Sequence, residues 1–502
     1  MGRRARTAAP AGASAGPEVT GLRQFIGGQW LNSSGGRTFE DLDPWNGKVV
    51  ARVPAGDSHD ARAAIEAAHA AFPGWTRTSP GVRQEIFLEA AEVLRRRRAE
   101  IMGLLAAETG CGHAFGSIQL DFVLSLLRQA SGAGYAAVGQ VIPSDEPDAF
   151  AMAVRHPVGV VAAIAPWNAA LVLSCRAIAA PLVLGNTVVL KPSEESPWVG
   201  GLLWAEIFEE AGLPPGVLNV VTHARGEAGA IGQELVSHPW VRRINFTGST
   251  ATGRRLAEAA GRHLKRMVLE LGGQNPLIIL ADADVDYAVN AAAYGSFLHQ
   301  GQICMCARRI FVERPLAAEF LGRFAAKTAA LPCGDPKDRG TVIGPLINDY
   351  ALRTVARRVD EAVASGARVL AGGTAAGPCY PATLIVDVPA ETELARHETF
   401  GPVVIADVVE SAEEALAQAN DSRYGLTAGV LTGDPERGLA LANRLEAGIV
   451  HVNDQPIHDE PQMPFGGVKD SGWGRFGVTF AMEEFTEMRW VTLAGGSRSF
   501  PF

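Results

Sequence analysis

Short, continuously apolar segments alternate with longer segments of helical spacing, and this alternation constrains the fold more than any other feature. The apolar segments after residue 150 are rich in β-branched residues and run over 158–164, 186–191, 217–221 and 241–246. Between them, apolar residues recur at helical spacing over 177–184, 197–211 and 226–237. Strands that alternate with helices form a parallel sheet covered on both faces, and such doubly buried strands are apolar throughout. The pattern therefore predicts an α/β fold.

A second series of the same kind starts after residue 270. It contains strands expected at 276–280, 309–312, 429–431 and 449–452, and a helix expected at 285–300. A chain of 502 residues can bury more than one large core, and chains of this length divide into domains. Two α/β domains are predicted, with a boundary near residue 270.

Composition and charge exclude several classes of protein. The net charge of -9 leaves no strong basic field, which argues against a nucleic-acid or anionic-membrane partner. No stretch is long and apolar enough to span a bilayer, so no membrane partner is expected. Residues 1–20 are rich in Arg, Ala, Gly and Pro but lack the apolar core of a signal peptide, so a disordered tail is predicted.

The six cysteines are scattered along the chain. They show neither the paired spacing of a zinc site nor that of a disulfide framework, so no metal site is predicted. They are interpreted as reduced thiols of a cytoplasmic protein. The six are Cys111, Cys175, Cys304, Cys306, Cys333 and Cys379.

Three short motifs carry residue types suited to nucleophilic catalysis. Cys304 lies in the segment 299–309, which reads His-Gln-Gly-Gln-Ile-Cys-Met-Cys-Ala-Arg-Arg. Glu270 lies 34 residues before Cys304 and is followed by Leu-Gly-Gly. Asn168 ends the turn-forming string Ala-Pro-Trp-Asn, which follows a predicted strand. A cysteine attacks as a thiolate, so it must lie where its pKa can be lowered. A carboxylate of raised pKa can activate water, and a side-chain amide can stabilise an oxyanion.

These motifs, in this order, closely resemble the aldehyde dehydrogenase superfamily, and the resemblance runs from about Phe25 to Thr486. It implies a variant Rossmann NAD-binding domain, a second α/β catalytic domain and a small β oligomerisation flap that pairs subunits into a homodimer or homotetramer. The implied boundaries are 21–139 and 157–270 for the first domain, 271–470 for the second, and 140–156 with 487–502 for the flap.

The resemblance also implies roles for the motif residues. Cys304 is the implied nucleophile, with Asn168 and the backbone N–H of Cys304 binding the oxyanion. Glu270 is implied to activate water that releases a thioester as a carboxylic acid, and coenzyme-A-acylating relatives generally lack this glutamate. Cys306 is the rival nucleophile, but its position has no equivalent nucleophile in the family. We therefore predict that Cys306 lines the substrate pocket.

A nicotinamide dinucleotide cofactor is implied as well, although the fingerprint Gly-x-Gly-x-x-Gly is absent. Phe246, Gly248 and Ser249 instead open a helix whose N-terminus can hold a pyrophosphate. Lys191 and Glu194 match the family pair that holds the adenosine ribose. A carboxylate there repels a 2′-phosphate, so NAD is favoured, with NADP as the alternative.

Further cofactor residues follow from the resemblance. Glu398 and Phe400 match the segment that grips the nicotinamide ribose, with Thr399 between them where the family usually has a bulky aliphatic residue. Gly226 and Gly229 fit the helix start on the adenosine side. The remaining residues expected at the cofactor are Ile164, Pro166, Trp167 and Leu271.

The expected aldehyde pocket has a pattern typical of aromatic substrates. Small Ala169 and charged Arg176 follow the Pro-Trp-Asn turn, and His458-Asp-Glu lies shortly before Phe465-Gly-Gly. This pattern looks most like the vanillin, benzaldehyde and salicylaldehyde dehydrogenases, although Ala170 stands where that group tends to have proline. Arg176 either pairs with an acid in the structure or donates to a polar substituent of the substrate. The residues expected to line the pocket are Ala169, Arg176, Ile303, Cys306, His458 and Phe465.

The predicted function is therefore oxidation of a small-molecule aldehyde, aromatic or otherwise bulky, to a carboxylic acid with NAD. The alternatives are a coenzyme-A-acylating enzyme, an aliphatic or semialdehyde dehydrogenase, and a non-catalytic structural relative. Intact Cys304, Glu270, Asn168 and Lys191 argue against the last of these.

Overall fold

The structure, a computed structural model, describes residues 19–496 and 499–502. Residues 1–18 of the predicted tail lie outside the described residues, whereas residue 20 belongs to strand β1 (Thr20–Gly21). In the described part of the chain no helix has the length and apolarity needed to cross a membrane. The same residues contain no group of three or more His, Cys, Asp or Glu side chains that could hold a metal ion.

The first sheet has eight strands, and its five central strands are parallel. The strands are β2 (Gln24–Ile26), β3 (Gln29–Leu31), β8 (Val160–Ile164), β9 (Thr187–Lys191), β10 (Leu218–Val220), β11 (Val241–Thr247), β12 (Arg266–Glu270) and β22 (Gly472–Trp473). Their order is β22-β12-β11-β8-β9-β10-β2-β3, with β8 to β12 parallel. The chain adds β9 and β10 on one side of β8 and then β11 and β12 on the other. Open α/β sheets bind ligands at such a reversal, outside the carboxyl ends of the strands.

Helices cover both faces of this sheet, which confirms the predicted α/β class. Val160 and Ala162 of β8 pack on one face with α1 (Ser58–Trp75), α8 (Ala228–Ser237) and α9 (Thr250–Arg262). Val161 and Ala163 pack on the other face. The helices there are α2 (Pro80–Arg96), α3 (Arg98–Thr109), α4 (His113–Ser131), α6 (Ala170–Val183) and α7 (Leu203–Glu210). Because both faces are buried, the strand is apolar at every position.

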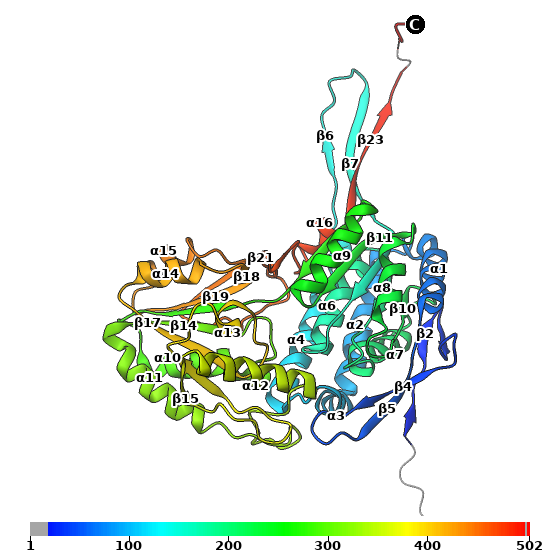
Figure 1. Cartoon of the computed structure of the whole chain (residues 1–502). Coiled ribbons are helices and arrows are strands. Elements are labelled where there is room, and N and C mark those ends of the chain that lie inside the picture. The colour runs from blue at the N-terminus through cyan, green and yellow to red at the C-terminus, as the bar shows by residue number, and fades with distance from the viewer. Residues whose placement is uncertain (1–18, 497–498) are drawn as a thin grey trace, which may run out of the picture.

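A second sheet of seven strands lies beside the first (Figure 1). Its order along the sheet is β15 (Arg368–Ala371), β16 (Thr383–Val386), β17 (Val403–Val409), β14 (Ala307–Glu313), β13 (Asn275–Ile279), β19 (Thr427–Leu431) and β20 (Ile449–Val452). The helices packed on it are α10 (Val285–Phe297), α11 (Arg314–Ala329), α12 (Asp349–Ala364), α13 (Glu393–Arg396), α14 (Ala412–Asn420) and α15 (Pro435–Ala442). Leu277 and Ile278 of β13 face opposite cores.

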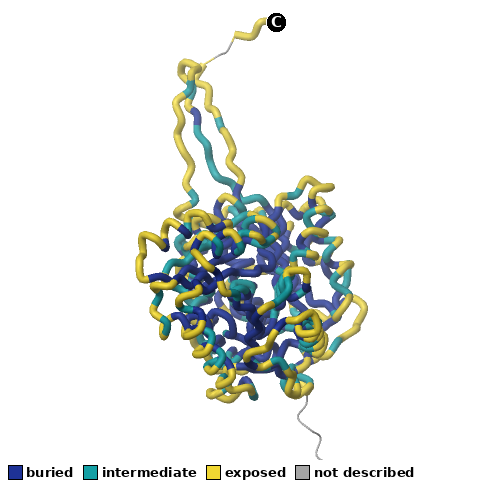
Figure 2. The backbone as a smooth tube through the Cα atoms, turned by 60° about the vertical axis from the view of Figure 1, so that its left-hand side comes forward, coloured by how far each residue is buried: buried dark blue, intermediate teal, exposed yellow. Residues whose placement is uncertain are grey.

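A slender three-stranded sheet projects from the body (Figures 1 and 2). It consists of β6 (Gln140–Ile142), β7 (Ala149–Pro157) and β23 (Thr486–Ala494), with β7 in the centre and antiparallel to both neighbours. The two segments predicted to form a flap therefore pair with each other within one chain. Apolar side chains on this arm are open to solvent, with Val141 69%, Trp490 79% and Leu493 68% exposed.

The remaining elements are short. They are β4 (Thr38–Leu42), β5 (Val49–Pro54), α5 (Ala133–Ala136), the π-helix η1 (Trp198–Leu202), the 3-10 helix η2 (Leu298–Gly301), β18 (Tyr424–Gly425), β21 (Val468–Lys469) and α16 (Ala481–Phe485). The helix predicted at 197–211 thus starts as η1 and continues as α7. The buried Glu108 carboxylate accepts the backbone N–H groups of Trp198 and Val199 at this start, at 2.8 and 2.6 Å.

Candidate active site

Cys304 lies on a strained loop between α10 and β14. The loop passes through His299, Gln300 and Gly301, whose φ angles are 51°, 54° and 68°. A left-handed conformation costs a residue with a Cβ about 1–3 kcal/mol, so the surrounding structure must hold the loop in place. The Gln300 side chain does so by donating from Nε2 to the carbonyls of Gly110 and Pro345, at 2.9 and 3.0 Å.

Further side chains fix the nucleophile loop. Gln302 Oε1 accepts the N–H of Ile347 at 3.0 Å. Asn275 Nδ2 donates to the carbonyls of Cys304 and Cys306, at 2.7 and 2.9 Å. Sequence reasoning did not identify Gln300, Gln302 or Asn275 as anchors. Gln300 and Gln302, on either side of Gly301, could have been recognised as anchors, because amides expected to be buried require hydrogen-bond partners.

The environment of the Cys304 thiol differs from the expectation of a lowered pKa. Burial raises the pKa of Cys304 well above its ordinary value, and the nearby Glu270 carboxylate raises it further. Arg176 acts in the opposite direction on the pKa of Cys304. A thiol with a raised pKa retains its proton near neutral pH, so a base must remove the proton of Cys304 before the sulfur can attack.

Cys306 does not line the pocket, which corrects the sequence prediction. Its N–H donates to the carbonyl of Ile303 at 3.0 Å, and this turn directs Cys306 away from the cavity beside Cys304. The side chain is fully buried in the core below the first sheet, and burial raises the pKa of the Cys306 thiol. Met305 occupies the cavity wall instead.

Glu270 lies at the carboxyl end of β12 and is only 2% exposed. Burial raises the pKa of Glu270 to about 8, and the adjacent Cys304 thiol opposes part of that rise. Within the described residues, Oε1 of this carboxylate has no hydrogen-bond partner. A buried carboxyl group with a raised pKa and a free oxygen can act as a proton acceptor near neutral pH. Glu270 is therefore not a solvated surface residue.

Asn168 lies in the turn between β8 and α6, and it is 5% exposed. It borders the same cavity as Cys304. In the part of the chain that the structure describes, its side-chain amide makes no hydrogen bond, unlike most buried amides. The N–H donors of Asn168 are therefore available to a ligand in the cavity.

The cavity beside Cys304 has a volume of about 280 Å³ and a mostly apolar lining. Of the six residues expected to line it, all except Cys306 do so. The lining residues are Phe115, Ile118, Gln119, Phe122, Asn168, Ala169, Val172, Leu173, Arg176, Tyr294, Leu298, Ile303, Cys304, Met305, Ile457, His458, Asp459 and Phe465. An aromatic ring fits such a volume and surface.

Arg176 is both paired with an acid and part of the cavity wall. It forms a buried ion pair with Asp459, a residue that sequence reasoning did not select. Its guanidinium carbon lies 4.2 Å from the ring centre of Phe465 and 5.4 Å from that of Phe122. His458 lies at the rim, with Nδ1 2.8 Å from Asp454. Acidic neighbours raise the pKa of His458.

The residues predicted at a pyrophosphate lie where β11 meets α9. Ser249 caps α9 by accepting the N–H of Thr252, at 3.3 Å, and the helix N-terminus carries a partial positive charge. A Cβ at Gly248 would lie 2.6 Å from the ring of Phe246, so the turn requires glycine. A helix N-terminus beside a glycine suits a pyrophosphate.

The structure also places seven of the other predicted cofactor residues. Glu398 accepts the N–H of Gly273 at 3.1 Å, and Phe400 and Trp167 meet edge-to-face at 5.6 Å between ring centres. Burial raises the pKa of Glu398 to about 7. Ile164 and Leu271 have side chains in the core, so only their backbones can face a ligand. Gly226 has a φ of 80°, whereas nothing in the structure requires glycine at 229.

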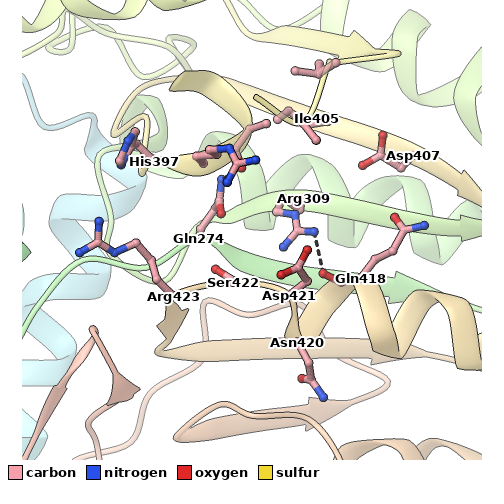
Figure 3. A pocket seen from close by; sticks show the side chains of 14 residues that line it. Gln274, Arg309, His397, Ile405, Asp407, Gln418, Asn420, Asp421, Ser422 and Arg423 are labelled. Atoms are coloured by element: carbon pink, nitrogen blue, oxygen red, sulfur yellow. Dashed lines mark hydrogen bonds between the residues drawn. The ribbon is translucent and has the colours of Figure 1, made fainter. Parts of the chain in front are cut away.

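A larger cavity, of about 750 Å³, is lined by residues of the second sheet and of neighbouring helices and loops (Figure 3). Its lining includes Arg309, Asp407 and Asp421, and Arg309 Nη2 donates to the carbonyl of Gln418 at 2.7 Å. It contains none of the predicted catalytic residues, so size alone does not identify the active site.

A cysteine and an unpaired amide that line one cavity, with a buried carboxyl group beside the cysteine, are the parts of an enzyme that forms a covalent adduct with a carbonyl compound. The chain belongs to the aldehyde dehydrogenase family, whose profile matches residues 30–491. This confirms the predicted family, fold and enzyme class.

Relatives and solved structures match over nearly the whole chain. It is 46% identical to a vanillin dehydrogenase of Pseudomonas fluorescens over 477 residues, which cover 95% of this chain and 98% of the relative. It is 41% identical to a benzaldehyde dehydrogenase [NAD(+)] of Pseudomonas putida, and the match covers 94% of this chain and 96% of the relative. The crystal structure of a salicylaldehyde dehydrogenase from Pseudomonas putida G7 complexed with salicylaldehyde matches with a TM-score of 0.94 and 38% identity, covering 96% and 100%.

Proposed function

We propose that this enzyme oxidises an aromatic aldehyde to the carboxylic acid with NAD. The observation that carries the proposal is an apolar cavity of about 280 Å³ lined by Cys304 and Asn168, with the buried carboxyl group of Glu270 beside the Cys304 thiol. The lining suits an aromatic ring, and the similarity to vanillin, salicylaldehyde and benzaldehyde dehydrogenases supports the same class of substrate.

The chemistry begins with the thiol of Cys304. Glu270 takes the thiol proton, since its raised pKa makes it a competent base, and the sulfur attacks the aldehyde carbon. The oxyanion that forms is stabilised by the Asn168 amide and the backbone N–H of Cys304. Collapse of the oxyanion expels a hydride from carbon and leaves a thioester. NAD, when bound, supplies the acceptor for that hydride.

Hydrolysis completes the cycle. Glu270 first releases the thiol proton to solvent; it then deprotonates a water molecule, and the resulting hydroxide adds to the thioester carbon. The C–S bond breaks, the carboxylic acid leaves, and Cys304 regains its proton. One carboxyl group therefore serves both half-reactions, which requires a pKa close to the working pH.

The residues present fit a dinucleotide. The N-terminus of α9 and Gly248 suit a pyrophosphate, and Lys191 at the end of β9, with Glu194 three residues later, suits the adenosine ribose. A carboxylate at Glu194 disfavours a 2′-phosphate, which supports NAD over NADP. We further propose a cytoplasmic location, because all six cysteines are free thiols.

Absorbance of NADH tests the proposal directly. Purified enzyme with NAD and benzaldehyde should produce NADH at 340 nm, and the rate should not depend on coenzyme A. A requirement for coenzyme A would show acyl transfer instead of hydrolysis. Activity with aliphatic aldehydes alone would contradict the aromatic substrate class, and the absence of NADH formation with every aldehyde of a broad panel would contradict the enzyme assignment.

Arg176 should select aldehydes with an oxygen substituent on the ring. A charge-assisted hydrogen bond from its guanidinium contributes about 1.5–3 kcal/mol, so Arg176→Leu should lower kcat/KM about 10–100-fold for hydroxy- and methoxybenzaldehydes. Plain benzaldehyde should be little affected. Steady-state kinetics on the matched aldehydes measures this difference.

A control is required because Arg176→Leu leaves the buried Asp459 carboxylate without its partner. The double variant Arg176→Leu with Asp459→Asn removes both charges and should show the same discrimination between aldehydes. Equal losses on benzaldehyde and on the oxygenated aldehydes would show that the ion pair has only a structural role.

The projecting arm should form a subunit interface. Strands β6 and β23 are free edges that carry exposed apolar residues, and such edges pair with other chains. We expect a homodimer or homotetramer by light scattering at micromolar concentration. Trp490→Arg on β23 should shift the population towards monomer, whereas Tyr350→Arg, an exposed residue far from the arm in sequence, should not. A monomeric wild-type protein would contradict the prediction.

A further inference from the structure

A buried histidine lies beside the lysine of the proposed ribose site. His223 is 1% exposed and Lys191 is 7% exposed, and His223 Nε2 lies 2.6 Å from Lys191 Nζ. The same imidazole nitrogen lies 3.8 Å from Glu194. Three residues that follow or end two neighbouring strands, β9 and β10, therefore form one polar cluster.

The contacts of His223 define its protonation. Nδ1 lies 3.0 Å from the carbonyl of Ala224, which accepts but cannot donate, so Nδ1 carries the proton. Nε2 then presents a lone pair to the Lys191 ammonium, which only donates. Burial, and then the adjacent Lys191, lower the pKa of His223 to about 4, so the imidazole is neutral near pH 7.

Among the described residues, the contacts of Lys191 leave one of its three donors free. Its ammonium has three N–H bonds; one points to His223 and one donates to the carbonyl of Pro192 at 3.0 Å. Burial lowers the pKa of Lys191 to about 8, with Glu194 opposing this, so the charge persists near pH 7. With two donors fixed, the direction of the third is fixed as well.

We propose that His223 is a positioning residue for cofactor binding: its neutral imidazole holds Lys191 so that the remaining N–H, together with Glu194, receives the adenosine ribose hydroxyls. This inference rests on the proposed use of NAD by this site. Sequence reasoning selected Lys191 and Glu194 but not His223, because 29 residues separate His223 from Glu194 in the chain.

Two substitutions of similar size distinguish the role of His223 as a hydrogen-bond acceptor from its role in packing. His223→Gln can place an amide oxygen near the position of Nε2, whereas His223→Leu fills similar volume with no acceptor. Isothermal titration calorimetry measures binding of NAD, of ADP-ribose, which contains the adenosine ribose, and of nicotinamide mononucleotide, which lacks it. Thermal unfolding of each variant reports its folding.

The leucine variant should bind NAD and ADP-ribose about tenfold more weakly, and the glutamine variant within about threefold of wild type. Binding of nicotinamide mononucleotide should be unchanged in both. If the leucine variant fails to fold, His223→Asn, whose shorter side chain withdraws from Lys191, should show the same tenfold loss.

Wild-type affinity for ADP-ribose in the leucine or asparagine variant would overturn the role of His223. So would equal losses in the glutamine and leucine variants, since these would show a requirement for the imidazole shape alone. Failure of the wild-type protein itself to bind NAD would contradict the proposed cofactor, and this outcome is distinct from both.

Discussion

Cys304→Ala should abolish aldehyde oxidation, with a loss of kcat of at least about 10⁴-fold, because no other group near the cavity can form the thioester. Affinity for NAD should stay close to that of wild type, since the predicted cofactor contacts lie on β9, the β11–α9 turn and the 398–400 segment. Production of NADH and calorimetric binding of NAD measure the two quantities separately.

Cys306→Ala is the matched control, two residues along the same loop. Its thiol is fully buried and does not reach the cavity, so this variant should keep most of its activity and lose only some thermal stability. An inactive Cys306 variant combined with an active Cys304 variant would reverse the assignment of the nucleophile.

Glu270→Gln should slow steady-state turnover by about 10²–10⁴-fold, the usual contribution of a general base. If the substitution slows deacylation more than any other step, acyl-enzyme accumulates. A rapid burst of NADH equal to the enzyme concentration should then precede slow turnover. Stopped-flow absorbance at 340 nm resolves the burst. Glutamine preserves the shape of the side chain, so the folded structure should be retained.

The structure makes the size of this burst informative. The pKa of the Cys304 thiol is raised and Glu270 is the carboxyl group beside it, so the same residue can also activate the nucleophile. Loss of the burst would show that Glu270 is required for attack by the thiol. Unimpaired turnover would remove Glu270 from the mechanism.

The pH dependence provides a second test of the same residue. Glu270 acts as a base only when deprotonated, and its pKa is about 8. Turnover limited by this base should therefore rise about tenfold per pH unit below pH 8 and level off above it. The Gln variant should lose this rise, because its amide does not titrate in that range.

Much of the fold was predictable because it follows from local patterns. Segments 158–164, 186–191 and 241–246 are rich in apolar residues, and they coincide with the largely buried strands β8, β9 and β11. The helix expected at 197–211 was less accurate: η1 precedes α7 because Glu108, from α3, accepts the first backbone N–H groups. No pattern local to 197–211 contains that carboxylate.

The sequence by itself determined the family, the order of strands and helices, and the identity of the residues proposed for chemistry, since each depends on residue type and short spacing. Only the tertiary structure decided their environments. Burial raised the pKa of Cys304 instead of lowering it, and a turn moved Cys306 out of the pocket. Arg176 forms an ion pair with Asp459, which lies 283 positions later in the chain. Burial and charge pairing depend on distances in space, and separation along a sequence does not specify such distances.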